Sequence, residues 1–470
     1  MLSVSLLFAY LVILWLYLLW RRRSLYRVMF QLPGPIGYPI LGSLHKLWNN
    51  EGVNTLGNWT LRYGPSYLFW VGPTPMYIVS DPGLIQELLN SPHAINKSQL
   101  VYGVIQQLLG AGILTLDNPV WSKHRRLLNV AFAHNILLSF MPIFNEESTA
   151  LVQEFDTFVG QGEKELLSRF QNFSLRTATQ TTMGTEVKKE DTYKSDILVN
   201  KYKRYCILNY SLNIVTIMLL KVFLQLIIDE KLDNSNNSSS KIATTTFIDV
   251  AIEQFRNRVF NYSNLEEEAN TIVFGAFETT ALTMTYTLMN LAMFPEYQER
   301  VFEEIKSVFP NAGDFEVTYE EIQKLEYLDM VINESMRLMP TFPITARKIS
   351  QDLKLSNGIV LPKGLEIGIS VLQTHRSKDI WGPDAHTYNP DHFLPSNLQD
   401  KHPYAFLPFL KGKRSCIGAK YASILMKMTL AKILRNYKFS TNYRLEDLVI
   451  VDYVTLKFKE TPGLQLERRD

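Results

Sequence analysis

Cysteine is the residue type this chain has least of, because only Cys206 and Cys416 occur among 470 residues. Two thiols cannot build a disulfide framework, and so few in a long chain are typical of a protein that works on the reducing side of a membrane. The sequence also lacks a phosphate-binding glycine loop, a zinc-type cluster of histidine and cysteine, and an internal repeat. These absences exclude nucleotide-binding loop enzymes, zinc modules and repeat architectures.

A strong charge of either sign is absent as well, since the formal net charge is +2 at pH 7. Such a chain has no overall attraction to nucleic acid, so any basic surface must be local, and we expect no nucleic-acid partner. Hydrophobic residues make up 46% of the chain and charged residues 20%, which predicts an ordinary folded globular protein.

Residues 1–20 carry no charge and are almost wholly apolar, and Arg21, Arg22 and Arg23 follow at once. As a helix, about twenty such residues can cross ~30 Å of hydrocarbon. A cleaved signal peptide would have its positive charge before the apolar run, and arginines tend to stay in the cytosol. We therefore predict a transmembrane signal anchor over residues 1–20, rather than a buried core helix. A basic, proline-rich hinge over residues 21–38 and a cytosolic domain over residues 39–470 should follow.

Most of this domain has the pattern of helices joined by turns. Capping boxes and prolines mark the predicted helix boundaries: Ser263 with Glu266 before a run to Met293, Pro295, and Thr318 with Glu321 before a run to Pro340. Strand-like runs lie near residues 76–79, 359–361 and 455–458, and residues 234–240 form a polar loop. We therefore predict a mainly α fold with a small β region.

The most informative stretch is residues 409–418 (FLKGKRSCIG), which precede a helical run over residues 419–436. A cysteine just before a helix lies near free backbone amides, which should lower the pKa of its thiol. A buried thiolate needs a metal or another cation beside it. Gly412 and Gly418 permit tight turns and the approach of a flat cofactor, whose carboxylate Arg414 could bind. The alternative is a core cysteine at a helix start, but this combination of residues favours a ligand.

This segment resembles the haem-binding signature of the cytochromes P-450, F-x-x-G-x-R-x-C-x-G, and matches its fixed positions at Phe409, Gly412, Arg414, Cys416 and Gly418. The resemblance covers essentially the whole chain. It implies one mainly α domain that binds haem b, with Cys416 as the ligand of the iron. It also implies cofactor contacts for Phe409, Arg414 and Gly418.

Other landmarks of that family follow in its usual order. Trp121 and Arg125 match W-x-x-x-R, which implies that both bind a haem propionate, and Arg347 matches a further propionate contact. Without the resemblance, residues 121–128 (WSKHRRLL) would be interpreted as a solvated basic face.

Glu334 and Arg337 are similar to the E-x-x-R pair of the family, which is buried beneath the haem. The third partner of that network corresponds to His392, where the family more often has arginine. By spacing alone, this pair would be an ordinary surface ion pair.

Residues 274–280 (FGAFETT) resemble the oxygen-activation segment of the family, which implies a helix bulge beside the oxygen site. Thr279 would supply a hydroxyl and Glu278 an acid for proton delivery. A threonine on an apolar helix more often bonds back to a carbonyl. Ala276 replaces a glycine of the family pattern. Gly275 stands where many fatty-acid hydroxylases have a glutamate esterified to haem, so the resemblance implies non-covalent haem apart from the bond to Cys416.

The chain looks closest to the insect branch related to the fatty-acid ω-hydroxylases, although the interval between Met183 and Gly275 is short for that branch. The resemblance implies a monooxygenase at the endoplasmic reticulum membrane, with its catalytic domain in the cytosol. It would act on O2 and an apolar substrate, with electrons from NADPH–cytochrome P-450 reductase and cytochrome b5 as a further electron donor. The alternatives are a peroxide-rearranging enzyme, a ligand binder or a decayed homologue. The sequence does not identify the substrate.

Overall fold

A computed structural model of the chain describes residues 2–21, 23–29, 32–38, 41–47, 52–185, 224–233, 245–452 and 455–469. Cys206 and the polar loop over residues 234–240 lie outside the described residues. Most of the interval between Met183 and Gly275 that looked short also lies outside them.

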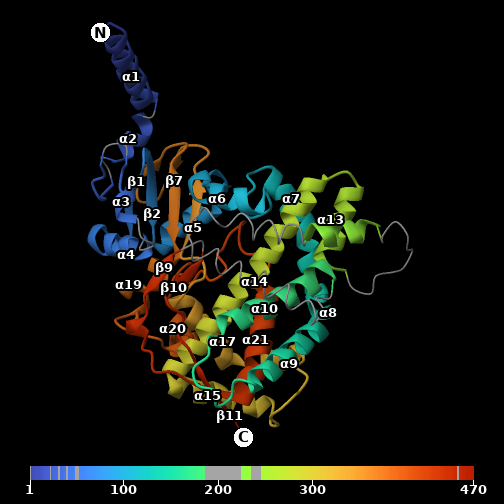
Figure 1. Ribbon diagram of the computed structural model, residues 1–470. Helices are drawn as coiled ribbons and strands as arrows, with labels where there is room; N and C mark the ends of the chain where they lie inside the picture. The colour runs from blue at the N-terminus through green and yellow to red at the C-terminus, as the bar shows by residue number, and fades with distance from the viewer. Residues whose placement is uncertain are drawn as a thin grey trace.

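A long central helix, α14 (Tyr262–Met293), runs through the domain and is surrounded by the other helices (Figure 1). Every α14 residue from Thr280 to Ala292 is buried, as expected for a helix in the core of a large domain. The helix packs closely against α10 (Leu167–Ala178), α17 (Glu326–Leu338) and α21 (Ala419–Asn436). The remaining helices named here are α1 Leu2–Arg21, α2 Arg23–Met29, α3 Leu44–Leu47, α4 Gly52–Tyr63, α5 Pro82–Asn90, α6 Gln99–Leu109, α7 Val120–Leu128, α8 His134–Ser139, α9 Met141–Asp156, α13 Phe247–Arg256, α15 Pro295–Val308, α16 Tyr319–Gln323, α18 Val371–His375, α19 Lys378–Trp381 and α20 Pro395–Leu398.

The β structure of the described residues is small, as predicted. Its main sheet has the strand order β1-β2-β7-β4-β3, in which only β2 and β7 are parallel. Three two-stranded sheets pair β9 with β10, β8 with β11, and β5 with β6. The strands are β1 Ser66–Val71, β2 Thr74–Val79, β3 Asn96–Lys97, β4 Ile344–Lys348, β5 Leu353–Lys354, β6 Val360–Leu361, β7 Glu366–Ser370, β8 Tyr437–Ser440, β9 Ile450–Asp452, β10 Leu456–Phe458 and β11 Gln465–Arg468. The three predicted strand regions coincide with β2, β6 and β10.

Two predicted helix boundaries are wrong. Helix α14 begins earlier, because Asn261 and Asn264 form its capping box in place of the predicted Ser263 and Glu266. The run predicted after Thr318 is divided into α16 and α17. The second helix begins there because the carboxylate of Glu304 accepts hydrogen bonds from the amides of Tyr327 (2.6 Å) and Leu328 (2.9 Å), which have no partner within the first turn of α17.

At the N-terminus, helix α1 projects away from the body of the domain (Figure 1). None of the helices in the described part of the chain has both the length and the apolar character needed to cross a membrane. The signal anchor over residues 1–20 therefore stays a prediction.

Candidate active site

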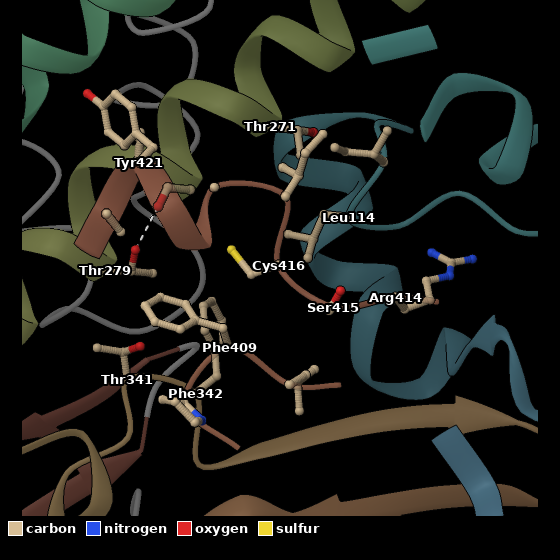
Figure 2. Close-up of a pocket in the computed structure, with 18 of the residues that line it drawn as sticks. Leu114, Thr271, Thr279, Thr341, Phe342, Phe409, Arg414, Ser415, Cys416 and Tyr421 are labelled. Carbon is tan, nitrogen blue, oxygen red and sulfur yellow. Dashed lines mark hydrogen bonds between the residues drawn. The ribbon is translucent and has the colours of Figure 1, made fainter. Parts of the chain in front are cut away.

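A cavity lies between α14 and the loop that carries Cys416 (Figure 2). Helix α14 contributes Thr271, Ile272, Phe274, Gly275, Ala276, Thr279, Thr280 and Thr283 to its wall. The cysteine loop, the start of α21, α7, β3 and residues 340–345 close the remaining sides. The cavity therefore brings together segments that lie more than three hundred residues apart in the sequence.

The cysteine loop has a fixed backbone. The amide of Cys416 donates to the carbonyl of Phe409 at 2.9 Å, and the amide of Ser415 donates to that of Gly412 at 3.1 Å. Gly412 has φ +77°, and a Cβ atom there would lie 2.6 Å from the carbonyl oxygen of Leu89, so only glycine fits. Gly418 has a φ of −90°, open space where a Cβ atom would lie, and a place in the cavity wall, so its backbone conformation does not require glycine but leaves room beside the cavity.

The thiol of Cys416 faces the cavity from this loop, just ahead of α21 (Figure 2). Cys416 counts as exposed, but its accessible surface opens onto the cavity, and protein surrounds the sulfur on its other sides. Burial raises the pKa of the Cys416 thiol, whereas a hydrogen bond from the Gly418 amide and the charge of Arg125 lower it by less. The prediction of a lowered pKa is therefore wrong for the polypeptide alone, and a cation bound to the sulfur must stabilise the thiolate.

Three cationic side chains line the cavity: Lys97, Arg125 and Arg414. Arg347 is not part of the wall but is buried close enough for its charge to act on Lys97 and Arg414. Arg414 stacks on the ring of Trp121, with 4.2 Å from Cζ to the ring centroid. Lys97 and Arg347 are cross-strand neighbours on β3 and β4. No carboxylate of the described residues lines this cavity, so the three cations in its wall face no opposite charge there.

Burial, together with neighbouring positive charges, lowers the pKa values of these cationic side chains. Burial, followed by the charge of Arg347, lowers the pKa of Arg414 to about 9. Burial also lowers the pKa of Arg347, and burial together with both arginines lowers that of Lys97 well below its ordinary value. Within the described chain, Nε and Nη1 of Arg414 and Nη2 of Arg347 are buried without a hydrogen-bond partner. Such donors indicate an anionic ligand at this side of the cavity.

Lys97 was missed by the sequence analysis. Nothing in the sequence distinguishes it from the other lysines and arginines, of which the chain has 48 in total. Its proximity to Arg347 arises from the pairing of β3 with β4, which joins segments about 250 residues apart in the sequence.

The residues around the cavity fit iron protoporphyrin. Its iron would take the sulfur of Cys416, and its two propionates would meet the unpartnered donors of Arg347 and Arg414. A Cβ atom at Gly275 would meet nothing within 4 Å, so this face of α14 leaves room for a flat ring.

The predicted oxygen-activation segment lies on α14, opposite the cysteine loop. Thr279 lines the cavity, and its hydroxyl donates to the carbonyl of Gly275 at 2.7 Å. Glu278 is fully buried but is not part of the cavity wall. Its carboxylate is 2.7 Å from Nζ of Lys457 and accepts a hydrogen bond from Nε2 of Gln171 at 2.8 Å. The two side chains diverge because consecutive helix residues point about 100° apart. Their catalytic roles stay predictions.

The bulge expected in α14 is not observed, since the helix is α-helical from Tyr262 to Met293. A π-helical turn occurs elsewhere, at Thr179–Met183, directly after α10. Thr182 in this turn lines the cavity. The hydrogen bond from the Thr279 hydroxyl to the carbonyl of Gly275 lies within one regular helix. It is the structural role that a threonine on an apolar helix more often has.

Comparison with known proteins decides the family. The sequence profile of the family described as Cytochrome P450 matches residues 32–452. The chain belongs to the cytochrome P-450 family. It is 46% identical to "Probable cytochrome P450 313a4" of Drosophila melanogaster, with 97% of each chain covered. It is 28% identical to "Cytochrome P450 4c3" of the same species, covering 96% of this chain and 91% of the relative, and 28% identical to "Cytochrome P450 4c21" of Blattella germanica, covering 90% of each.

This cytochrome P-450 is therefore an oxidoreductase, a haem-thiolate monooxygenase that uses haem b with a cysteine thiolate as ligand. The family confirms the predicted reaction class and cofactor.

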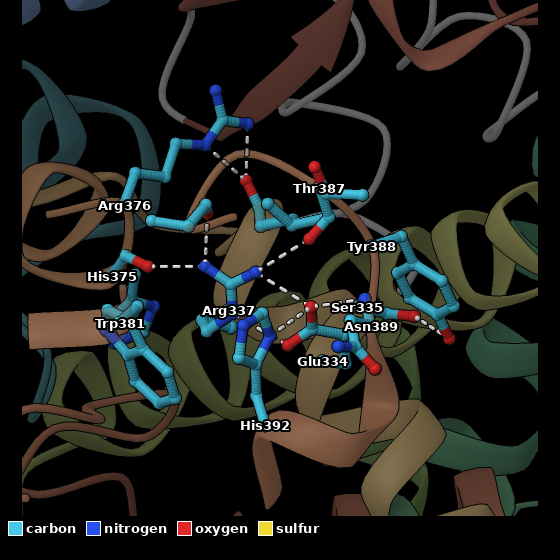
Figure 3. A network of polar contacts seen from close by, with 12 residues as sticks. Glu334, Ser335, Arg337, His375, Arg376, Trp381, Thr387, Tyr388, Asn389 and His392 are labelled. Atoms are coloured by element: carbon cyan, nitrogen blue, oxygen red, sulfur yellow. Dashed lines mark hydrogen bonds and ion pairs between the residues drawn. The ribbon is translucent and has the colours of Figure 1, made fainter. Parts of the chain in front are cut away.

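The E-x-x-R pair of this P-450 forms a buried network that joins α17 to residues 375–392 (Figure 3). Arg337 donates to both carboxylate oxygens of Glu334, at 2.6 and 2.7 Å, and neither side chain is exposed. Glu334 also binds Nδ1 of His392 at 3.1 Å and accepts from the amide of Asn389 at 2.8 Å. His392 thus occupies the third position of the network, and its other ring nitrogen is 3.2 Å from a carboxylate oxygen of Asp384.

Proposed function

We propose that this P-450 inserts one oxygen atom from O2 into an apolar small molecule, such as a fatty acid, a hormone-like lipid or a xenobiotic. The observation that supports this best is the shared cavity, in which the Cys416 thiol and the Thr279 hydroxyl accompany an otherwise largely apolar wall. Leu114, Phe274 and Phe342 belong to that wall and suit an apolar substrate.

Bound haem supplies the iron at which O2 is activated, and the reaction consumes two electrons and two protons for each oxygen atom inserted and each water released. The Cys416 sulfur would hold the iron and would supply it with electron density. The cationic side chains would hold the propionates, and among them Arg414 and Arg347 offer donors without a partner in the described chain. No covalent link beyond the sulfur is proposed, because Gly275 has no carboxylate.

Proton delivery is assigned to Thr279 and Glu278. Thr279 already lines the cavity, whereas Glu278 is paired with Lys457 on β10. To pass a proton to the cavity, the carboxylate of Glu278 must leave Lys457 and turn around α14 toward Thr279.

Electrons are proposed to come from NADPH–cytochrome P-450 reductase, with cytochrome b5 as a second donor. Arg126, Lys413 and Lys420 are exposed, and the stacking of Arg414 on Trp121 places α7 next to the cysteine loop. These cations form a basic patch that an acidic flavin domain could recognise. Lys411 contributes less, because its ammonium group donates to the carbonyl of Pro403 and lies over the ring of Tyr404.

The patch can be tested by charge reversal. Lys413→Glu and Lys420→Glu should each slow haem reduction by the reductase at low salt and lose that effect at high salt. Lys354→Glu, at an exposed position on β5, is the matched control. Reduction rates that respond to neither salt nor charge reversal would remove the patch from the proposal.

The enzyme is proposed to reside in the endoplasmic reticulum membrane, with the catalytic domain in the cytosol. The support is the charge-free run over residues 1–20 and the three arginines after it. Deletion of residues 1–20 should move the protein from the membrane pellet to the supernatant. A truncated protein that still sediments with membranes would show that another surface holds it there.

The reaction is tested by reconstituting the full-length, haem-loaded enzyme with reductase and NADPH. A spectral binding screen over fatty acids, terpenoids and insecticides selects candidate substrates, and product formation is then measured by mass spectrometry. NADPH-dependent hydroxylated product supports the proposal. Turnover with organic peroxide alone would indicate a rearranging enzyme, and ligand binding without turnover would indicate a ligand binder or a decayed homologue.

A further inference from the structure

A histidine–carboxylate pair is buried beside the cavity but is not part of its wall. Nδ1 of His124 on α7 lies 2.8 Å from Oε1 of Glu268 on α14. The side chain of His124 is 4% exposed and that of Glu268 is 0% exposed. The ring of His124 also lies against Phe260, with 4.5 Å between ring centroids. Neither His124 nor Glu268 lines the cavity.

The second oxygen of Glu268 binds a different segment. Oε2 accepts a hydrogen bond from the amide of Ile113 at 3.0 Å, and Ile113 and Leu114 are part of the cavity wall. This segment lies directly on α14, since a Cβ atom at Gly112 would be 2.2 Å from Oγ1 of Thr271. Leu114 and Thr271 are both drawn at the cavity in Figure 2. One carboxylate thus fixes both α7 and a loop of the cavity wall to α14.

The position of His124 determines what this contact controls. It precedes Arg125 by one residue and follows Trp121 by three, and both of those side chains line the cavity at its cationic side. Successive helix residues are about 100° apart, so a contact that fixes the direction of His124 also fixes the rotation of α7 about its axis. That rotation determines where Trp121 and Arg125 point.

The free energy of burying this pair favours a role in orienting α7 relative to α14 over a role in merely holding the two helices together. Burial raises the pKa of Glu268, and the hydrogen bonds from His124 and Ile113 only partly offset that effect. An apolar pair of similar volume would hold α7 and α14 together at least as well. A buried polar pair also fixes the relative orientation of the elements that it joins, because its hydrogen bonds form in only one arrangement of the two helices and the loop.

We propose that His124 and Glu268 are positioning residues that couple the propionate side of the haem site to the substrate-side wall formed by Ile113 and Leu114. A change in the orientation of α7 is then transmitted through Glu268 to that wall, and the reverse also holds. The inference rests on the proposed function only in taking the cavity as the site of haem and substrate. Neither residue touches substrate or haem, so both act through their neighbours.

The test uses the full-length, haem-loaded protein with Glu268→Gln, His124→Phe and the double variant. Glu266→Gln on α14 and Lys123→Gln on α7 change a neighbouring charge outside the pair and serve as matched controls. The propionate-bending bands of the resonance Raman spectrum report the propionate side. Absorbance titrations with imidazole and 4-phenylimidazole, which bind iron from the substrate side, report the wall, because only the larger probe reaches it.

Each single variant should shift the propionate bands and weaken 4-phenylimidazole binding by about 5- to 50-fold, with a far smaller effect on imidazole. The double variant should change both readouts no more than the stronger single variant, because the two residues act as one unit. The controls should match the wild type in both readouts.

Variants that lose stability but keep wild-type propionate bands and Kd values would show a merely structural pair and overturn the proposal. A shift in only one of the two readouts would overturn the coupling. These measurements need no NADPH turnover, so they stand whether or not the proposed monooxygenation is observed. Where Glu268→Gln does not fold, His124→Phe, which keeps an aromatic ring against Phe260, decides the outcome.

Discussion

Replacement of Arg337 by methionine tests whether the buried network between α17 and residues 375–392 stabilises the fold. Arg337 donates to Glu334 through two nitrogens and to the backbone carbonyls of His375 (2.8 Å), Ala385 (2.6 Å) and Thr387 (3.1 Å). The variant leaves the Glu334 carboxylate fully buried without its main partner, as Figure 3 makes clear.

The expected loss follows from these contacts. Breaking a buried ion pair by removing one partner costs about 3–5 kcal/mol of unfolding free energy. Each carbonyl that loses its donor adds on the order of 1 kcal/mol. Against a total of about 5–15 kcal/mol for a typical domain, Arg337→Met should remove about half or more of the free energy of unfolding.

Arg300→Met is the matched control. Arg300 binds Asp391 through two nitrogens at 3.0 and 3.1 Å, next to His392 in the same segment, but its side chain is 48% exposed. Loss of this exposed pair should cost at most about 1 kcal/mol. Equilibrium urea unfolding of the haem-loaded proteins, followed by tryptophan fluorescence and haem absorbance, measures both losses.

Equal losses in Arg337→Met and Arg300→Met would refute the reasoning, because burial would then not distinguish the two pairs. Should Arg337→Met fail to fold, Arg337→Lys provides the measurement. Lysine keeps the charge but cannot reproduce the forked contact with Glu334 together with the three carbonyls. A lysine variant with wild-type stability would contradict the assigned role of the fork.

Four further outcomes are expected. Cys416→Ser should abolish the red-shifted carbon-monoxide band of the reduced protein whereas Cys206→Ser keeps it, and a retained band in the first variant would contradict the ligand assignment. Thr279→Ala should keep that band but lower product per NADPH by about tenfold or more, with the electrons appearing as hydrogen peroxide; unchanged coupling would mean that Thr279 only bonds its own helix. Acid–organic extraction should release all haem unmodified, because Gly275 cannot form an ester, and haem that remained on the polypeptide would contradict the correspondence of Gly275 with the esterified glutamate. Lys97→Ala should speed haem transfer to apomyoglobin by about tenfold, as expected for one charge-assisted hydrogen bond, and wild-type transfer would remove Lys97 from the site.

Much of the site could be predicted from local sequence, because its key residues occur at fixed spacings on single segments. Cys416 with its glycines, Trp121 with Arg125, and Glu334 with Arg337 are of this kind. The structure places Cys416, Gly418, Trp121 and Arg125 in the wall of one cavity and pairs Glu334 with Arg337, whereas their contacts with haem stay predictions. The fold class could also be predicted, since helix patterns and capping boxes dominate the chain.

What could not be predicted depends on partners distant in sequence or on a balance of opposing effects. Lys97 reaches the cationic side of the cavity only through strand pairing, and Lys457 meets Glu278 only in the folded domain. The pKa of Cys416 depends on burial outweighing a nearby amide and a guanidinium group, and the sign of that balance requires coordinates. The start of α14 moved by two residues because two asparagines cap it in place of the expected serine and glutamate.

The spread of the cavity residues along the chain constrains biosynthesis. Lys97, Trp121 and Arg347 are all synthesised before Cys416, which is followed at once by α21, the helix behind the loop. During translation, the cationic side chains that are proposed to bind the propionates are therefore synthesised before the cysteine that is proposed to bind the iron. Stable haem capture must follow synthesis of α21, so haem incorporation is a late step of maturation, and nascent chains that stop before residue 416 cannot bind the cofactor through sulfur at this site.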